Sequence, residues 1–288
     1  MEASELIRRV RRVELRARGL SSQIFSGEYH SAFKGRGMAF SENRAYQHGD
    51  EIRTIDWNVT ARMRSPYVKV FEEERELTAM LLIDVSASGK LGSREKSKRE
   101  LAAELAAVLA FSAGQNNDKI GAILFSDRIE RFIPPKKGRS HILRIVREII
   151  DLEPEGKGTD ITSALEHFGR VMKKRTIAFL ISDLQDTGFG DVLKRTARRH
   201  DLVALQLVDD VELQAAKFGW LAATDPESGM ASFIDTSSVR WRKRYTAAAQ
   251  SFQSELVDSM KRSGVDHAVL NTAKPYVQPL MQLFDRRG

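Results

Sequence analysis

Three short segments of the chain carry side chains that could together hold a hard metal ion. They are Asp-Val-Ser-Ala-Ser at 84–88, Gly-Thr-Asp at 158–160 and Ser-Asp at 182–183. Carboxylate and hydroxyl oxygens suit Mg²⁺, Mn²⁺ or Ca²⁺ better than zinc or copper, and we expect Mg²⁺. Because few carboxylates would contact the ion, it would keep positive charge and could accept a Glu or Asp from a partner protein. The candidate ligands are Asp84, Ser86, Ser88, Thr159 and Asp183.

The elements around these segments are expected to bring them to one edge of a sheet. Residues 79–85 and 176–181 are continuous apolar runs, which are typical of strands buried on both faces. Two of the three segments follow such a run, and the third precedes a helical pattern at 161–172. Ligands of open parallel sheets bind outside the carboxyl ends of the strands. The alternative is that Ser88, Thr159 and Asp160 only cap turns or helices.

The pattern along the chain predicts an α/β fold with a mostly parallel sheet flanked by helices. We expect an N-terminal helix within 1–19, a small β-rich subdomain over 20–77 and the α/β domain over 78–288. Further strands are predicted at 120–125, 129–133, 202–208 and 266–270, with a hairpin at 220–234. Further helices are predicted at 96–112, 140–150, 191–199, 238–263 and 275–284.

Composition favours a cytoplasmic protein. The chain has no cysteine, which excludes disulfides and zinc–thiolate sites, and no apolar run is long enough for a transmembrane segment. The formal net charge of +7 is spread along the chain, so no nucleic-acid partner is expected. A basic nucleic-acid-binding protein remains an alternative, carried by the N-terminal arginines and by the run at 240–244.

The rival functional class is an enzyme, namely a metal-dependent phosphoesterase. Phosphatases of the haloacid dehalogenase type also place Asp at the end of the first strand, followed by a second Asp two residues later. Here the second position is Ser86, which is a poor acid or base at neutral pH. No phosphate-binding Gly-x-x-x-x-Gly-Lys loop and no Gly-x-Ser-x-Gly elbow occur in the sequence. We therefore expect no enzymatic activity.

The Asp-x-Ser-x-Ser string followed by a Thr and an Asp resembles the metal-ion-dependent adhesion site (MIDAS) of von Willebrand factor A domains. The matching positions are Asp84, Ser86, Ser88, Thr159 and Asp183. The resemblance implies a von Willebrand factor A-like (Rossmann-like) fold. It also implies that the ion grips an acidic residue of another protein.

A second resemblance lies in the N-terminal part and extends over essentially the whole chain. The segments at 35–40, 44–46, 49–53, 55–57, 61–62 and 71–76 resemble a bacterial family called domain of unknown function fifty-eight. This resemblance implies a partnership with MoxR-type AAA+ ATPases in chaperone-like assembly. From the residues themselves, we expect a buried ion-pair and aromatic cluster; a partner-binding surface is the alternative. That cluster would comprise Asp50, Arg53, Asp56, Trp57 and Arg62.

Overall fold

The computed structural model describes most of the chain. The described residues are 13, 14, 17, 19, 20, 39–72, 77–90, 96–214, 217, 219–224 and 231–287. The predicted N-terminal helix lies largely outside them, as does the turn predicted within the 220–234 hairpin. The chain forms two compact units, residues 34–77 and residues 1–33 together with 78–288.

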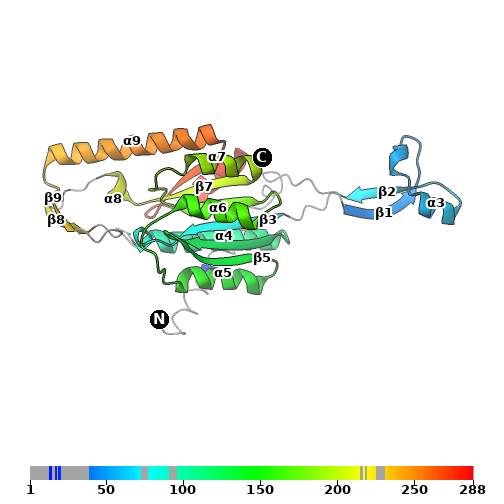
Figure 1. Ribbon diagram of the computed structural model, residues 1–288, viewed down its shortest axis with the longest axis horizontal. Coiled ribbons are helices and arrows are strands. Elements are labelled where there is room, and N and C mark those ends of the chain that lie inside the picture. The colour runs from blue at the N-terminus through cyan, green and yellow to red at the C-terminus, as the bar shows by residue number, and fades with distance from the viewer. Residues whose placement is uncertain are drawn as a thin grey trace. The chain divides into compact units, whose positions relative to one another are not determined.

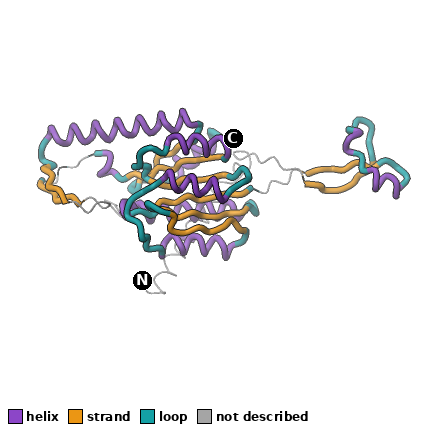
Figure 2. The backbone as a smooth tube through the Cα atoms, viewed as in Figure 1, coloured by secondary structure: helices purple, strands orange, loops and turns teal. Residues whose placement is uncertain are grey.

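The larger unit is built on a six-stranded sheet with the order β10-β7-β6-β3-β4-β5. All neighbours are parallel except β5, which runs antiparallel to β4 at one edge. The predicted α/β architecture with a mostly parallel sheet is thus confirmed (Figures 1 and 2). The strands are β3 (Thr78–Asp84), β4 (Lys119–Phe125), β5 (Ile129–Lys136), β6 (Ile177–Ser182), β7 (Asp201–Val208) and β10 (Asp266–Asn271).

Helices cover both faces of this sheet (Figure 1). One face packs a single apolar core against α6, α7 and the second half of α9, including Phe168, Leu193 and Met260. On the other face, Phe179 of β6 meets Phe284 of α10 edge to face, with ring centroids 6.5 Å apart. The helices are α4 (Lys98–Gln115), α5 (Arg139–Asp151), α6 (Ile161–Val171), α7 (Gly190–Arg199), α8 (Asp210–Leu213), α9 (Val239–Ser263) and α10 (Val277–Asp285).

The central strands are apolar because both of their faces are covered. Six of the seven residues of β3 and all six of β6 are buried. Helix α4 is also buried on most sides, and it begins with a capping box in which Ser97 and Glu100 satisfy each other's backbone N–H groups. A separate antiparallel pair, β8 (Trp220–Thr224) with β9 (Ala231–Asp235), confirms the predicted hairpin strands.

The smaller unit contains a two-stranded antiparallel sheet of β1 (Ala39–Ala45) and β2 (Tyr67–Glu72). Between these strands lie a 3-10 turn, η1 (Ile52–Thr54), and helix α3 (Trp57–Met63). Asp56 caps α3 by accepting hydrogen bonds from the N–H groups of Asn58 and Val59. The prediction of a small N-terminal β-containing part is confirmed, whereas its boundary at residue 20 stays a prediction because 21–38 lie outside the described residues.

Candidate metal centre

The candidate ligands lie at the carboxyl edge of the sheet, where its strand order changes direction. From β3 the chain crosses to β4 on one side, and from β6 it crosses to β7 on the other. Strands β3 and β6 are parallel neighbours, so Asp84 and Ser182 end next to each other. This is the topological switch point at which ligands of open α/β sheets bind.

Asp84 is the centre of a hydrogen-bond network that joins the three segments. Its Oδ1 accepts the backbone N–H of Ser86 at 2.9 Å. Its Oδ2 accepts the hydroxyl of Ser182 at 2.7 Å and, more weakly, that of Thr159 at 3.4 Å. Burial raises the pKa of Asp84, and the charge of Asp183 raises it further, while hydrogen bonds from Ser86 and Ser182 offset part of the rise. Two neighbouring buried carboxylates are an environment that a cation would stabilise.

The two serines of the first segment lie side by side. Ser86 immediately precedes a 3-10 turn, η2 (Ala87–Lys90), and Ser88 lies within it, shortly after β3 ends at Asp84. Their Oγ atoms are 3.0 Å apart. Neighbouring ligands on an octahedral Mg²⁺ with bonds of about 2.1 Å would lie ~3 Å apart, so this spacing fits one ion.

The loop that carries Thr159 is tied to the serine turn and to β4. Ala87 donates its N–H to the carbonyl of Lys157 at 3.1 Å, and Asp160 donates its N–H to the carbonyl of Ser126 at 2.9 Å. Asp160 is the N-cap of α6, accepting the N–H of Ser163 at 2.7 Å. The capping interpretation therefore holds for Asp160, while the Thr159 hydroxyl is directed to Asp84.

Asp183 has a partner that the sequence interpretation missed. The ammonium of Lys98, in the first turn of α4, lies 2.8 Å from Asp183 Oδ2 and 2.5 Å from Glu212 Oε1. The Lys98 side chain is only 2% exposed. Burial alone would lower the pKa of Lys98, but attraction from Asp183 and Glu212 outweighs burial, and the net shift is upward. Lys98 therefore stays charged.

A signal for Lys98 does exist in the sequence. Leu101, Ala102 and Leu105 follow it at the i+3, i+4 and i+7 spacing, which places the lysine on the buried face of its helix. A lysine in a first helical turn also opposes the helix dipole. A buried lysine in that position calls for an anionic partner.

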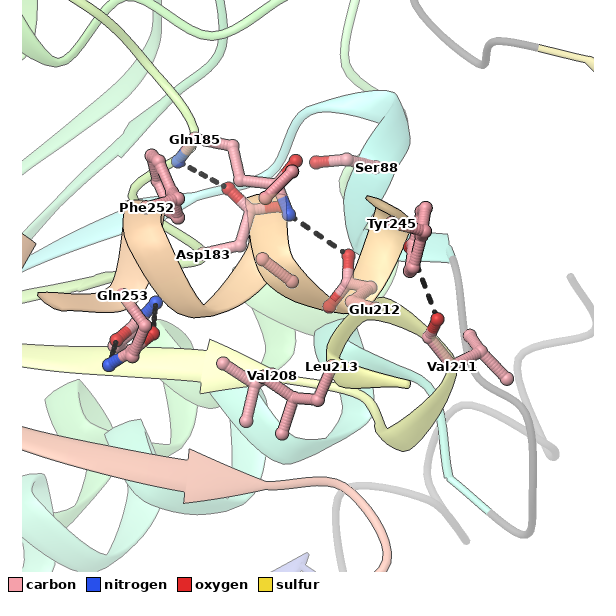
Figure 3. Close-up of a pocket in the computed structure, with 13 residues that line it drawn as sticks. Ser88, Asp183, Gln185, Val208, Val211, Glu212, Leu213, Tyr245, Phe252 and Gln253 are labelled. Atoms are coloured by element: carbon pink, nitrogen blue, oxygen red, sulfur yellow. Dashed lines mark hydrogen bonds between the residues drawn. The ribbon is translucent and has the colours of Figure 1, made fainter. Parts of the chain in front are cut away.

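A pocket of about 610 Å³ opens beside the candidate centre (Figure 3). Ser88, Asp183 and Glu212 contribute polar groups to its wall. Tyr245 and Phe252 of α9 contribute rings, and Val208, Val211 and Leu213 contribute aliphatic groups. The lining of the pocket thus combines carboxylate and hydroxyl groups with apolar side chains.

The donor set fits a hard divalent ion with an incomplete protein shell. Nowhere in the described part of the chain do three His, Cys, Asp or Glu side chains cluster as a metal site. The candidate centre instead offers two carboxylates and three hydroxyls, and it suits Mg²⁺, Mn²⁺ or Ca²⁺. Metal binding by these five residues remains a prediction.

The expectation of a buried cluster in the smaller unit is wrong. Trp57 is 67% exposed, and Arg53 and Arg62 are exposed as well. Asp50 instead pairs with Arg44 at 2.7 Å, and Asp56 caps α3. Local turn and cap interactions satisfy these carboxylates, so they do not require burial.

The described helices include none that is both long enough and apolar enough to cross a membrane.

Comparisons with known proteins place the chain in a family. Two solved structures are each similar to 73% of this chain. BatB from Bacteroides thetaiotaomicron has 15% sequence identity, with 98% of that chain covered and a TM-score of 0.48. An aerotolerance-related membrane protein from Bacteroides fragilis has 16% identity, with 99% of that chain covered and a TM-score of 0.48. Uncharacterised proteins of Mycobacterium bovis and Mycobacterium tuberculosis are 26% identical over 96% of this chain and 88% of their own length. The family model described as "Protein of unknown function DUF58" matches residues 42–255, and the chain belongs to that family.

Proposed function

We propose that this chain is a non-enzymatic docking module that grips an acidic residue of a partner protein through a divalent metal ion. Asp84, Ser86, Ser88, Thr159 and Asp183 would hold Mg²⁺, with Mn²⁺ or Ca²⁺ as alternatives. The observation that carries the proposal is the convergence of three hydroxyls and two carboxylates at the open edge of the sheet. A shell rich in neutral hydroxyls leaves charge on the ion, which a partner's carboxylate would then compensate.

The pocket beside the centre supports a protein partner over a small anion. Apolar side chains of β7, α8 and α9 line this pocket together with Asp183. A partner segment could place its carboxylate at the ion and a neighbouring apolar side chain against Phe252 or Val211. Such a segment would bury apolar area at the docking site, which strengthens binding.

The proposed partner is a MoxR-type AAA+ ATPase, and the proposed process is chaperone-like assembly or activation of other proteins in the cytoplasm. The family resemblance suggests this partner. The smaller unit, residues 34–77, exposes Ile52, Trp57 and Met63. These side chains are a candidate second contact with the same partner.

The experiment that tests the proposal measures the affinity of the immobilised ATPase for this chain in Mg²⁺ and in EDTA. We expect EDTA or Ser86→Ala to weaken the complex at least about tenfold, since either removes the ion that bridges the two proteins. Ser163→Ala is the matched control because that serine lies in the first turn of α6, near Thr159 in sequence, and is not one of the candidate ligands. Equal affinities in Mg²⁺ and EDTA would remove the metal from recognition.

A further inference from the structure

Lys98 is paired with Asp183, one of the carboxylates that the proposed metal ion needs. Its ammonium donates to Asp183 Oδ2 at 2.8 Å, and the other oxygen, Oδ1, accepts the backbone N–H of Gln185 at 3.3 Å. Both oxygens of Asp183 therefore already accept hydrogen bonds. A cation arriving at Asp183 must share this carboxylate with Lys98 or displace it.

The two cations would also repel each other. An ion held on or near Asp183 would lie within roughly 7 Å of the Lys98 ammonium, whether it is bound directly or through one water. Lys98 is buried, so little solvent lies between the charges to screen them. The ammonium thus opposes the ion through its charge as well as through its hydrogen bond.

Glu212 gives the ammonium a second partner outside the five candidate ligands. Its Oε1 accepts from Lys98 at 2.5 Å and from the side chain of Gln185 at 3.2 Å. Its Oε2 accepts the N–H of Asp209 in the capping box of α8, which holds the carboxylate in place. Lys98 can therefore give up Asp183 while remaining paired with Glu212.

We propose that Lys98 is a resident cation that holds Asp183 in the metal-free protein, that the divalent ion binds in competition with it, and that Glu212 retains the ammonium when the ion binds. This inference rests on the proposed metal centre and adds a determinant of its affinity. It makes the centre weaker and more readily emptied than the same ligands would be without the lysine.

The test is calorimetric titration of Mg²⁺ into the full chain at one pH. Lys98→Met should tighten binding by roughly tenfold or more, because both the competing hydrogen bond and the repulsion are removed. Glu212→Gln should weaken binding, because Lys98 then has only Asp183 as a charged partner. Lys96→Met is the matched control: Lys96 pairs with Glu104 at 2.8 Å just before α4, and its loss should leave the affinity unchanged.

The double variant Lys98→Met/Glu212→Gln completes a thermodynamic cycle and keeps the net charge of the wild type. If Glu212 acts through Lys98, the double variant should bind Mg²⁺ as tightly as Lys98→Met alone. The double variant also serves as the measurement if Lys98→Met fails to fold with two unpaired carboxylates; it should then bind more tightly than the wild type.

Three results would overturn the inference. If Lys98→Met and the double variant both bind Mg²⁺ no more tightly than the wild type, Lys98 only positions Asp183. The proposed metal centre would still stand. If Glu212→Gln lowers the Mg²⁺ affinity equally in the wild type and in Lys98→Met, Glu212 acts on the ion directly through its charge and not through Lys98. Absence of binding to the wild type and to every variant would remove the metal centre and this inference together.

Discussion

Asp84 ends strand β3 and Asp183 follows the neighbouring strand β6, yet their charges are compensated in different ways. Lys98 neutralises Asp183, whereas Asp84 accepts hydrogen bonds from a backbone N–H and from hydroxyl groups. Burial is the largest cause that raises the pKa of Asp84, and the charge of Asp183 is the next. The raised pKa means that the ionised carboxylate is destabilised at this position. A divalent ion between the two segments would offset that cost, and we therefore regard Asp84 as the residue on which metal binding depends most.

Asp84 is also poorly placed to act as a nucleophile. Both of its oxygens accept hydrogen bonds, and the position two residues later is Ser86 rather than a second carboxylate. We predict no measurable hydrolysis of p-nitrophenyl phosphate in Mg²⁺ or Mn²⁺, assayed by release of nitrophenolate. Metal-dependent turnover that disappears in Asp84→Asn would contradict this and would favour the phosphoesterase alternative.

The convergence of the five candidate residues could be predicted from the sequence, as could the need of Lys98 for an anionic partner. That Asp183 is this partner could not. The ligands follow long apolar runs or precede a helix, and these are local patterns. Lys98 meets Asp183 and Glu212 across 85 and 114 residues of sequence, respectively, so the ion triad exists only after the helix and strands are packed. The burial of Trp57 was wrongly expected for a related reason, because exposure depends on packing that residue types do not specify.

At the scale of elements, the loop between α5 and α6 controls where Thr159 lies. Glu130 of β5 accepts the hydroxyl of Ser126 at 2.6 Å and the N–H groups of Gly156 and Glu155 at 2.8 and 3.2 Å. Burial alone would raise the pKa of Glu130, but these hydrogen bonds outweigh it and lower the pKa. Glu130 is therefore an ionised clamp on the loop.

Gly156 is packed so tightly in this clamp that an added side chain must displace its neighbours. A Cβ there would lie 2.2 Å from both Ser126 Oγ and Asp127 Oδ1. Gly156→Ala should cost about 1–3 kcal/mol of stability and weaken Mg²⁺ binding by shifting Thr159. The control is Gly169→Ala in α6, where a Cβ meets nothing within 4 Å and should stabilise by up to about 1 kcal/mol. Thermal melts and Mg²⁺ titrations of the two variants measure these effects. An unchanged Mg²⁺ affinity in Gly156→Ala would show that metal binding does not depend on this loop clamp.

Most elements of the large unit could be predicted because buried strands and amphipathic helices have distinct periods. Strand β5 was predicted to end at residue 133 but continues to Lys136 through Pro134 and Pro135. Proline lacks an N–H and usually ends a strand; at the edge of a sheet it is tolerated. Helix α4 begins at Lys98 rather than at 96, where the capping box of Ser97 and Glu100 starts it.

At the scale of the whole molecule, the buried His200 and the half-buried His267 make stability depend on pH. Burial is the largest cause that lowers the pKa of His200 and of His267, each to about 4. Within the described structure, neither ring nitrogen of His200 has a hydrogen-bond partner. Both rings therefore stay neutral in the folded protein at pH values where they would take up a proton when unfolded.

We predict that stability falls as the pH is lowered from about 6.5 towards 4, because the unfolded chain binds these protons first. The loss from His200 is roughly 3 kcal/mol across that window, given its pKa of about 4. His200→Phe should remove part of this dependence while keeping the ring contact with Phe168, and His267 should account for a further part. Urea unfolding at pH 7 and pH 5 measures it; an unchanged difference between the two pH values in His200→Phe would contradict the assignment.

The central claim is that five residues at the carboxyl edge of the sheet hold one divalent ion. The most direct measurement is titration with Mn²⁺, followed by the electron paramagnetic resonance signal of the free ion. We predict one bound Mn²⁺ per chain for the wild type and for the control Ser163→Ala. We predict none at the same concentrations for Ser86→Ala/Ser88→Ala, although its circular dichroism and metal-free melting temperature should match the wild type. Equal Mn²⁺ binding by the folded double variant would contradict the account.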